Sequence, residues 1–262
     1  MTSPLLELDH VTKRFGRVVI AEDLSLSVGP GDVVGIVGPN GAGKTSLFGL
    51  ICGDLAPAAG EVRFAGRTVT RLDAAARCRL GIGRTYQVPR PFGDMTVFEN
   101  LLVAAQQGGG LRRRASYAAA VSALDRTGMS AHANVPAERL GLLRRKRMEL
   151  ARALATQPTL LLLDEVAGGL TDPEVAQLVE VIRGVNAEGT AVIWIEHVVR
   201  ALTAVVSRLM CLASGKFVGD GDPATVLALP AVREVFLGTE VTAALAGGSL
   251  AAPTADGGGG GP

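Results

Sequence analysis

The architecture of this chain follows from one glycine-rich stretch, Gly38-Pro39-Asn40-Gly41-Ala42-Gly43-Lys44-Thr45. An apolar run, Val33 to Val37, precedes it, and a helical pattern over about residues 44–50 follows it. Glycines let the backbone curl so that its N–H groups point at one place, where they can bind phosphate oxygens. A strand, such a loop and a helix in this order predict a P-loop, the phosphate-binding loop of many nucleotide-binding proteins.

The end of this loop has the chemistry that a nucleotide needs. Lys44 carries a compact positive charge for the β- and γ-phosphates, and the Thr45 hydroxyl can ligate Mg²⁺. The N-terminus of the following helix adds the positive end of its dipole. We therefore expect a continuous nucleotide-binding segment made of Gly38, Pro39, Asn40, Gly41, Ala42, Gly43, Lys44, Thr45 and Ser46.

A second apolar run ends in two acids, Leu160-Leu161-Leu162-Leu163-Asp164-Glu165. A buried strand brings the side chains at its carboxyl end to the edge of the sheet where open α/β folds bind ligands. We expect Asp164 to hold Mg²⁺ through water and Glu165 to polarise the attacking water as general base. Acids at a strand end also cap turns, but with a P-loop upstream they indicate hydrolysis of a nucleotide.

Strands and helices alternate along the rest of the chain. Short strands are predicted at residues 5–8 and 24–28, a hairpin arm at 61–64, and buried strands at 191–195 and 209–212. Residues 72–131 are mostly helical in pattern, with an interruption at 81–94, and residues 145–156 form a further helix. Asp172-Pro173 and Asp222-Pro223 predict the N-cap and first residue of two more helices. This order predicts an α/β fold with a P-loop core, a mostly parallel sheet, an antiparallel β arm and a helical insertion.

Composition limits the classes of protein to which the chain can belong. It has 262 residues, 48% of them hydrophobic, and a net charge of +1, which argues against a nucleic-acid binder that relies on a strong positive field. Its three cysteines, Cys52, Cys78 and Cys211, are scattered and indicate neither a disulfide framework nor a zinc site. No uncharged stretch reaches the ~18 apolar residues of a membrane helix, so any membrane role is expected to come through a partner.

With both nucleotide motifs in place, the chain resembles the ATPase subunits of ABC transporters. Gln87, in Arg84-Thr85-Tyr86-Gln87, matches the glutamine that in this family senses Mg²⁺ and contacts the permease. His197, after Ile195-Glu196, looks like the histidine that hydrogen-bonds the γ-phosphate. Phe15 matches the aromatic residue that stacks on adenine. Taken singly, these residues would be a surface amide, a loop histidine and a core aromatic, and it is their joint order that carries the resemblance.

The resemblance extends to one subfamily, the ATPases of branched-chain amino-acid importers. It rests on the segments 81–87, 149–156 and 232–238, and it covers roughly residues 4–239. It implies a cassette at 4–239 with a helical insertion at about 88–143, followed by a Gly/Ala/Pro-rich tail at 247–262 that we expect to be disordered. Importers of urea, amides and other polar solutes share these segments, so the transported solute stays open.

One segment departs from the family. The signature of ABC ATPases, usually Leu-Ser-x-Gly-Gln, falls on Leu140-Gly141-Leu142-Leu143-Arg144. The serine is missing at Gly141, and Leu143 replaces the glycine. In ABC dimers each ATP lies between the P-loop of one subunit and the signature of the other, so a homodimer would have two weakened sites. The basic run 144–147 could compensate by facing the γ-phosphate, or it could be a solvated helix face.

The resemblance also implies ligands, partners and a location. These are ATP and Mg²⁺, with Thr45, Gln87 and Asp164 around the metal, and Lys44, Glu165, His197 and Gln87 in hydrolysis. The partners are two transmembrane permeases and, indirectly, an extracytoplasmic solute-binding protein. Residues 89–92 would grip a permease helix, with an ordinary Pro-stiffened surface loop as the alternative. The altered signature adds our hypothesis that the second ATP-binding subunit differs from this chain. The location is the cytoplasmic face of the cell membrane.

Three other readings compete with the transporter ATPase. A non-transport ABC ATPase that acts on nucleic acid or ribosomes usually has tandem cassettes or a long coiled-coil insertion, and the sequence shows neither. A GTPase is disfavoured because the chain lacks an Asn-Lys-x-Asp motif that would read guanine, and a kinase because the Asp164-Glu165 pair suits ATP hydrolysis better. A non-hydrolysing binding subunit would explain the altered signature, but the presence of Glu165 and His197 argues against it.

Overall fold

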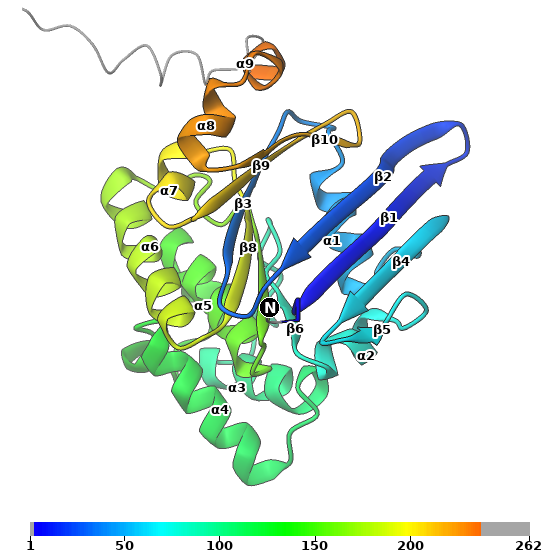
Figure 1. Ribbon diagram of the computed structural model, residues 1–262. Coiled ribbons are helices and arrows are strands. Elements are labelled where there is room, and N and C mark those ends of the chain that lie inside the picture. The colour runs from blue at the N-terminus through cyan, green and yellow to red at the C-terminus, as the bar shows by residue number, and fades with distance from the viewer. Residues whose placement is uncertain (1–2, 237–262) are drawn as a thin grey trace, which may run out of the picture.

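The central sheet carries the strands that were expected to hold the site. In the computed structural model, which describes residues 3–236, its order is β10-β9-β3-β8-β7-β6, with β10 antiparallel to β9 and the other neighbours parallel (Figure 1). The strands are β3 (Val33–Val37), β6 (Ile82–Arg84), β7 (Leu160–Asp164), β8 (Ala191–Ile195), β9 (Arg208–Ala213) and β10 (Lys216–Gly221). Their parallel order places the ends of β3, β6, β7 and β8 along one edge, which is where the predicted site residues follow.

The second sheet is antiparallel, with the order β2-β1-β4-β5. Its strands are β1 (Leu6–Phe15), β2 (Val18–Val28), β4 (Ala59–Phe64) and β5 (Arg67–Thr68). Strands are present at 5–8 and 24–28 as predicted, but they are much longer than expected, because β1 and β2 form one long hairpin. The register shifts along the hairpin, and the left-handed residues His10 and Asp23 lie in it at φ of 51° and 56°. Such bulges break the apolar alternation without ending the strand.

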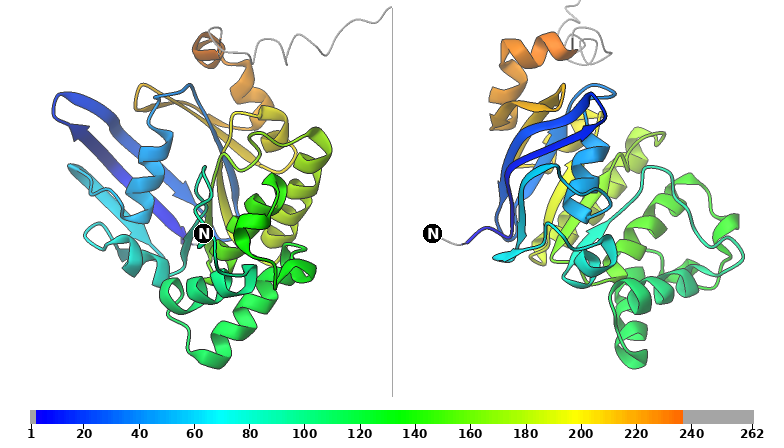
Figure 2. Two further views of the ribbon diagram at one scale, coloured as in Figure 1. Left: turned by 180° about the vertical axis from the view of Figure 1, so that it is seen from behind. Right: turned by 90° about the vertical axis from the view of Figure 1, so that its right-hand side faces the viewer.

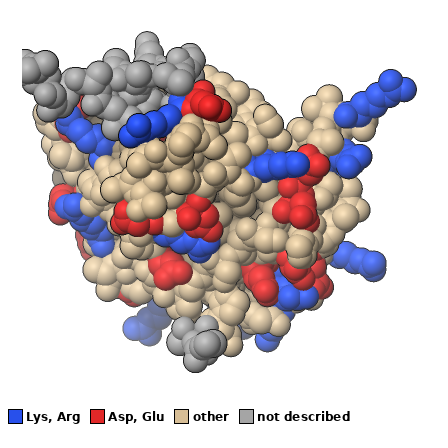
Figure 3. Space-filling model, turned by 45° about the horizontal axis from the view of Figure 1, so that its top comes forward, with Lys and Arg blue, Asp and Glu red and all other residues tan. Residues whose placement is uncertain are grey.

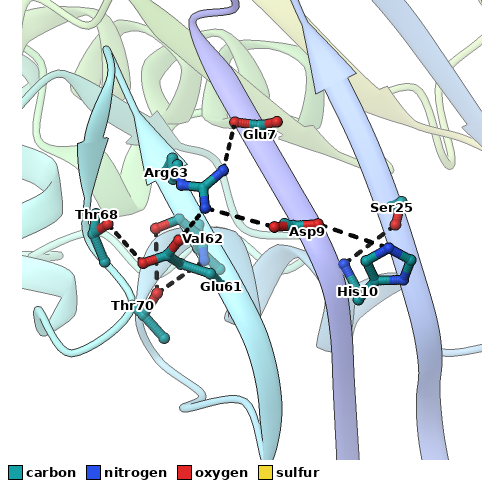
Figure 4. Close-up of polar contacts among 9 residues, drawn as sticks. All are labelled: Glu7, Asp9, His10, Ser25, Glu61, Val62, Arg63, Thr68 and Thr70. Atoms are coloured by element: carbon teal, nitrogen blue, oxygen red, sulfur yellow. Dashed lines mark hydrogen bonds and ion pairs between the residues drawn. The ribbon is translucent and has the colours of Figure 1, made fainter.

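Polar side chains cross the exposed face of this antiparallel sheet. Figure 4 shows the Arg63 guanidinium of β4 reaching Glu7 and Asp9 of β1 at 3.2 and 3.6 Å, and it also pairs with Glu61 beside it. The Glu61 carboxylate in turn accepts a hydrogen bond from the Thr68 hydroxyl at 2.7 Å. These partners span β1, β4 and β5, so the ladder of side chains adds to the backbone pairing in fixing their register.

Helices cover the central sheet on both faces. Figure 1 shows α1 between the central and the antiparallel sheets, while α5 and α6 lie on the opposite side of the central sheet. Figure 2 shows the α3–α4 region projecting away from both sheets. The α-helices are α1 (Lys44–Cys52), α2 (Ala74–Arg79), α3 (Val97–Val103), α4 (Arg113–Arg126), α5 (Leu142–Ala155), α6 (Asp172–Ala187), α7 (Val199–Thr203), α8 (Pro223–Ala228) and α9 (Pro230–Phe236). Three short segments complete the described helices, the π-helix Ala104–Gly108 and the 3₁₀-helices Ser130–His132 and Ala137–Arg139.

Caps at the helix N-termini show where the sequence prediction shifts by one residue. The N-cap of α6 is Thr171, not Asp172, and Pro173 is the second helical residue. The Glu174 carboxylate accepts from both the Thr171 N–H and its hydroxyl at 2.8 Å, which makes a capping box. Asp222 is the N-cap of α8 as predicted, with its carboxylate accepting from the N–H groups of Ala224 and Thr225.

The core has two parts, one on each face of the central sheet. Leu161 and Leu163 of β7 face the part that also contains residues of α5 and α6. Leu160 and Leu162 face the other part, which is shared with α1 and the antiparallel sheet. Successive side chains of a strand point to opposite faces, so a continuous apolar run is what a strand covered on both sides requires. This confirms the predicted α/β class with a mostly parallel sheet, an antiparallel arm and inserted helices.

The surface agrees with the near-neutral net charge. On the face drawn in Figure 3, Lys and Arg side chains lie interspersed with Asp and Glu side chains. No helix among residues 3–236 combines the length and the apolar character needed to cross a membrane. The predicted end of the cassette at residue 239 and the Gly/Ala/Pro-rich tail at 247–262 fall outside the described residues.

Candidate active site

The P-loop follows β3 and packs tightly against two other strands. Gly38 has φ of 154°, and a Cβ built on it would lie 2.0 Å from the carbonyl oxygen of Leu212 in β9. Gly43 has φ of 103°, and its Cβ would lie 2.4 Å from the carbonyl oxygen of Ile20 in β2. Only glycine fits both positions. The curled loop that the sequence predicts is therefore held by close backbone contact with β2 and β9.

Lys44 begins α1 and is buried under the loop. Its ammonium donates to the carbonyls of Gly38 at 2.7 Å and Pro39 at 3.0 Å. Burial lowers the pKa of Lys44, and the nearby carboxylates of Glu165 and Asp164 oppose that shift. The charge is thus held by loop carbonyls in front of two acids, where it can exchange these carbonyls for phosphate oxygens.

Asp164 ends β7, as predicted, and has a partner that the sequence did not suggest. The Arg84 guanidinium, at the end of the neighbouring strand β6, donates to the Asp164 carboxylate at 3.1 Å and to Asp54 at 3.0 Å. It also lies over the ring of Tyr86, 5.0 Å from the ring centre. Burial raises the pKa of Asp164, and the ion pair with Arg84 opposes that shift. The carboxylate expected to serve Mg²⁺ is thus held in place by a buried cation.

Glu165 and the residues predicted to work with it converge at one point. The backbone of Glu165 has φ of 47°, in the left-handed region that residues other than glycine rarely adopt. Its carboxylate accepts a hydrogen bond from the Gln87 amide. The His197 ring nitrogen Nδ1 lies 3.7 Å from the same carboxylate oxygen. Gln87 and His197, from separate parts of the chain, therefore meet at the carboxylate of Glu165, where a general base can be oriented towards a water molecule.

A cleft with a volume of about 630 Å³ extends from the P-loop to the segment around Gln87. Thr45, Gln87 and Asp164, the three residues expected around Mg²⁺, all line it. A hydroxyl, an amide carbonyl and a carboxylate are hard oxygen donors of the kind that Mg²⁺ prefers. The residues present therefore fit this ion next to a nucleotide bound on the P-loop. Val88, Arg90 and Ser46 line the same cleft, so it continues from the P-loop to the predicted permease contact.

Phe15 lies apart from this cleft, at the tip of the β1–β2 hairpin. Its side chain is 53% exposed, and the Lys13 ammonium lies 5.1 Å from the centre of its ring. Phe15 pairs with Val18, two residues before Ile20, whose carbonyl faces Gly43 of the P-loop. The same strand pair therefore presents an exposed aromatic ring and touches the phosphate loop, which is compatible with a base stacked on Phe15.

The altered signature lies at the start of α5. Gly141 is its N-cap, and a Cβ built there would meet no atom within 4 Å. Leu142 is 48% exposed. The basic run does not share one face, because Arg145 donates to the carbonyls of Leu140 and Glu138 while Arg147 donates to Gln177. The Lys146 ammonium also donates to the carbonyl of Glu165, so three of the four cations bind their own subunit.

Sequence reasoning missed two charged residues in this region, the partly buried Arg84 and the fully buried Glu196. Arg84 is 80 positions from its partner Asp164, so no local pattern could reveal the pair. Glu196 follows the buried strand β8 and is fully buried. An acid directly after an apolar strand was the signal that identified Asp164 and Glu165, and the same signal was present at Glu196.

Comparison with known proteins places this site in a family. Residues 21–168 match the ABC transporter family. The chain is 33% identical over 253 residues to LivG of Escherichia coli K12, a high-affinity branched-chain amino acid transport ATP-binding protein, with 91% of this chain and 99% of LivG covered. It is 32% identical over 240 residues to LptB of Acidithiobacillus ferridurans, a lipopolysaccharide export system ATP-binding protein, with 91% and 98% covered.

A solved structure gives the same result for the fold. The ADP conformation of an ATP-binding cassette of an ABC transporter superposes with a TM-score of 0.84 at 28% identity, and the match covers 91% of this chain and 100% of that one. The P-loop, the acids after β7 and this end-to-end similarity agree. The chain therefore belongs to the ABC transporter family, as an ATP-hydrolysing subunit of a transporter.

Proposed function

We propose that this chain drives an importer of branched-chain amino acids or related small polar solutes. The observation that supports this most is the similarity to LivG along nearly the whole of both chains. LptB, an export protein, is similar to nearly the same extent, so the assignment of import rests on the subfamily segments around residues 81–87, 149–156 and 232–238. Urea or amide import is the alternative within the same proposal.

Each site residue is assigned a role in binding or hydrolysing ATP. Lys44 and the backbone of the P-loop bind the phosphates of ATP, and Phe15 stacks on the adenine. Thr45, Asp164 and Gln87 provide oxygen ligands for Mg²⁺, which would neutralise phosphate charge in the reaction. Glu165 accepts the proton of the attacking water, and His197 hydrogen-bonds the γ-phosphate. The contacts of Gln87 and His197 with the Glu165 carboxylate support this assignment.

The proposed partners are two transmembrane permeases and, indirectly, an extracytoplasmic solute-binding protein. The chain would then lie on the cytoplasmic face of the cell membrane. Tyr86 and Val88, each at least half exposed, line the cleft that Gln87 also lines, and the half-exposed ring of Phe92 lies 5.9 Å from the guanidinium of Arg152 in the same cleft. Apolar groups around a cleft suit the binding of a helix from another protein. Gln87 would transmit the contact to the nucleotide.

We also propose that the second ATP-binding subunit differs from this chain. Gly141 brings no hydroxyl to the signature, and Leu143 is only half buried there. A different partner with an unaltered signature would complete the site on this chain's P-loop. The site on the partner's P-loop, which faces Gly141 and Leu143, would be the weaker one.

The proposal is tested by isolating the transporter. The chain, with an affinity tag, is purified from gently solubilised native membranes, and co-purifying chains are identified by mass spectrometry. We expect two permeases and a second ATP-binding subunit, and the complex in proteoliposomes should take up leucine or isoleucine in an ATP-dependent way. Permeases that support only urea or amide uptake would change the substrate. Recovery of soluble partners only would refute the transporter role.

A further inference from the structure

One buried carboxylate joins the two segments on which the proposed chemistry depends. Glu196 follows β8, and its side chain is fully buried. One of its oxygens accepts from the N–H of His197 at 3.1 Å and lies 3.5 Å from the Val198 nitrogen. The other accepts from the N–H of Ala167, two residues after Glu165, at 2.9 Å. A single side chain therefore bridges the His197 loop and the turn that follows Glu165.

The backbone around Glu165 is held from two further directions. The Glu165 N–H donates to the carbonyl of Ile195 in β8 at 2.9 Å. Its own carbonyl accepts from the ammonium of Lys146 in α5 at 3.3 Å. Glu165 has a left-handed backbone, which persists in a folded protein only where its surroundings hold it. Lys146, Ile195 and the Glu196 carboxylate supply that support.

Burying the charges of Glu196 and Lys146 costs free energy, which a purely structural role does not explain. Burial raises the pKa of Glu196, whose hydrogen bonds to backbone N–H groups oppose the shift. Burial lowers the pKa of Lys146, and the negative charge of Glu196 opposes that shift. Well-packed apolar residues often stabilise a fold as much as a buried charged pair does. A role in placing reactive groups accounts for the retained charges.

We propose that Glu196 is a positioning residue for ATP hydrolysis, which fixes the Glu165 carboxylate relative to His197, and that Lys146 supports it by holding the Glu165 backbone from the signature helix. This inference rests on the roles proposed above for Glu165 and His197. Glu196 itself touches neither substrate nor metal. It acts by setting the distance between two groups that must face the same water and phosphate, and small displacements of such groups have large effects on rate.

The substitution Glu196→Gln separates the two halves of this bridge. Glutamine has nearly the same shape, but only one of its two terminal atoms accepts hydrogen bonds. The amide oxygen is expected to stay with the His197 side, where two N–H groups meet it. The NH₂ group then faces the N–H of Ala167 and breaks the link to the Glu165 turn. The hydrogen bonds of Lys44 to the carbonyls of Gly38 and Pro39 do not involve Glu196 and are kept.

The experiment is a double-mutant cycle on the full chain in its transporter complex. We measure kcat and KM for MgATP in wild type, Glu196→Gln, Glu165→Gln and the double variant. We expect Glu196→Gln to lower kcat by about tenfold to a hundredfold, with KM changed by less than about twofold. Because Glu196 acts through Glu165, the double variant should be within about threefold of Glu165→Gln alone. Multiplicative losses, or a Glu196→Gln rate within about twofold of wild type, would overturn the proposal.

Two further variants serve as a control and as a second test of the proposed positioning role. Glu180→Gln removes an exposed carboxylate from α6 and should leave kcat and KM unchanged, which controls for the loss of charge. Lys146→Met tests the same support if Glu196→Gln does not fold. It should lower kcat by about threefold or more at unchanged KM and again be non-additive with Glu165→Gln, and wild-type turnover would contradict the proposal. If Glu165→Gln itself turns over normally, it is the base assignment that fails.

Discussion

At the scale of single residues, the site is a set of charges buried at the ends of strands. Lys44 follows the P-loop after β3, and Asp164 ends β7. Glu196 follows β8, and all three are at most 6% exposed. Buried charges cost free energy unless they are paired or hydrogen-bonded, and each of these has partners in the structure. Removing one of these side chains should therefore leave its partners without a hydrogen bond and also impair the binding or hydrolysis of ATP.

Replacing Lys44 tests the phosphate-binding role directly. Lys44→Ala removes the cation that is held by the carbonyls of Gly38 and Pro39. We expect the Kd for ATP to rise by about a hundredfold or more, which corresponds to ~3 kcal/mol. Isothermal titration calorimetry measures this, with Lys216→Ala, an exposed lysine on β10, as the matched control. A Kd within threefold of wild type would show that Lys44 does not bind phosphate.

Replacing Glu165 tests the general base. Glu165→Gln keeps the size of the side chain but removes its ability to accept a proton. We expect ATP to bind as in wild type, while turnover slows by ~10² or more, the range for the loss of a general base. The measurement is single-turnover hydrolysis next to a binding titration. Normal turnover would assign the base to another residue.

At the scale of elements, continuous apolar runs located four strands of the central sheet, β3, β7, β8 and β9. The predicted strand at 160–163 is β7, and the prediction at 191–195 coincides with β8. β6 was missed because its three residues lie in the interruption at 81–94 of a mostly helical segment, and its strand conformation comes from pairing with β7. A strand this short has too little sequence to show a period.

The bulge in the β1–β2 hairpin makes a prediction about pH. The Nδ1 atom of His10 lies 2.7 Å from the Asp23 carboxylate, and the protonated ring donates a hydrogen bond to it, which raises the pKa of His10 above its ordinary value. A raised pKa means that the contact stabilises the fold at pH values below the unfolded pKa of about 6.5, and that this contribution is lost as the pH rises through the folded pKa.

Proton NMR titration of the His10 ring measures this effect. In Asp23→Asn the pKa of His10 should fall towards about 6.5, because the partner loses its charge. The stability gained on lowering the pH through this range should shrink in parallel. An unaltered His10 titration would mean that the Asp23 contact is absent in solution.

At the scale of the whole molecule, the signature decides how two subunits can work together. It lies at the start of α5, and the same helix contacts the Glu165 carbonyl through Lys146. A site between two subunits depends on both surfaces, so the sequence of one subunit defines only half of it. The departure at Gly141 and Leu143 therefore predicts that the second subunit of the assembly differs from this chain.

Restoring the signature tests the asymmetric assembly. As a homodimer, the chain should hydrolyse ATP slowly, and Gly141→Ser with Leu143→Gly should raise this rate by about tenfold, the equivalent of ~1.4 kcal/mol. Position 141 has room for the new side chain, since a Cβ there meets no atom within 4 Å. Gly184→Ser in α6, where a Cβ also meets nothing within 4 Å, is the control. Full homodimer activity that restoration does not change would argue against a different partner.

The sequence by itself determined the α/β class, the P-loop and the place of Asp164 and Glu165, because these depend on local order: an apolar strand, then a loop or acids at its end. The approach of Arg84 to Asp164, the meeting of Gln87 and His197 at Glu165, and the bridge made by Glu196 were decided only by the tertiary structure. Parallel strands bring their carboxyl ends together across long stretches of sequence, and a local pattern records where each strand ends but not which strand lies beside it.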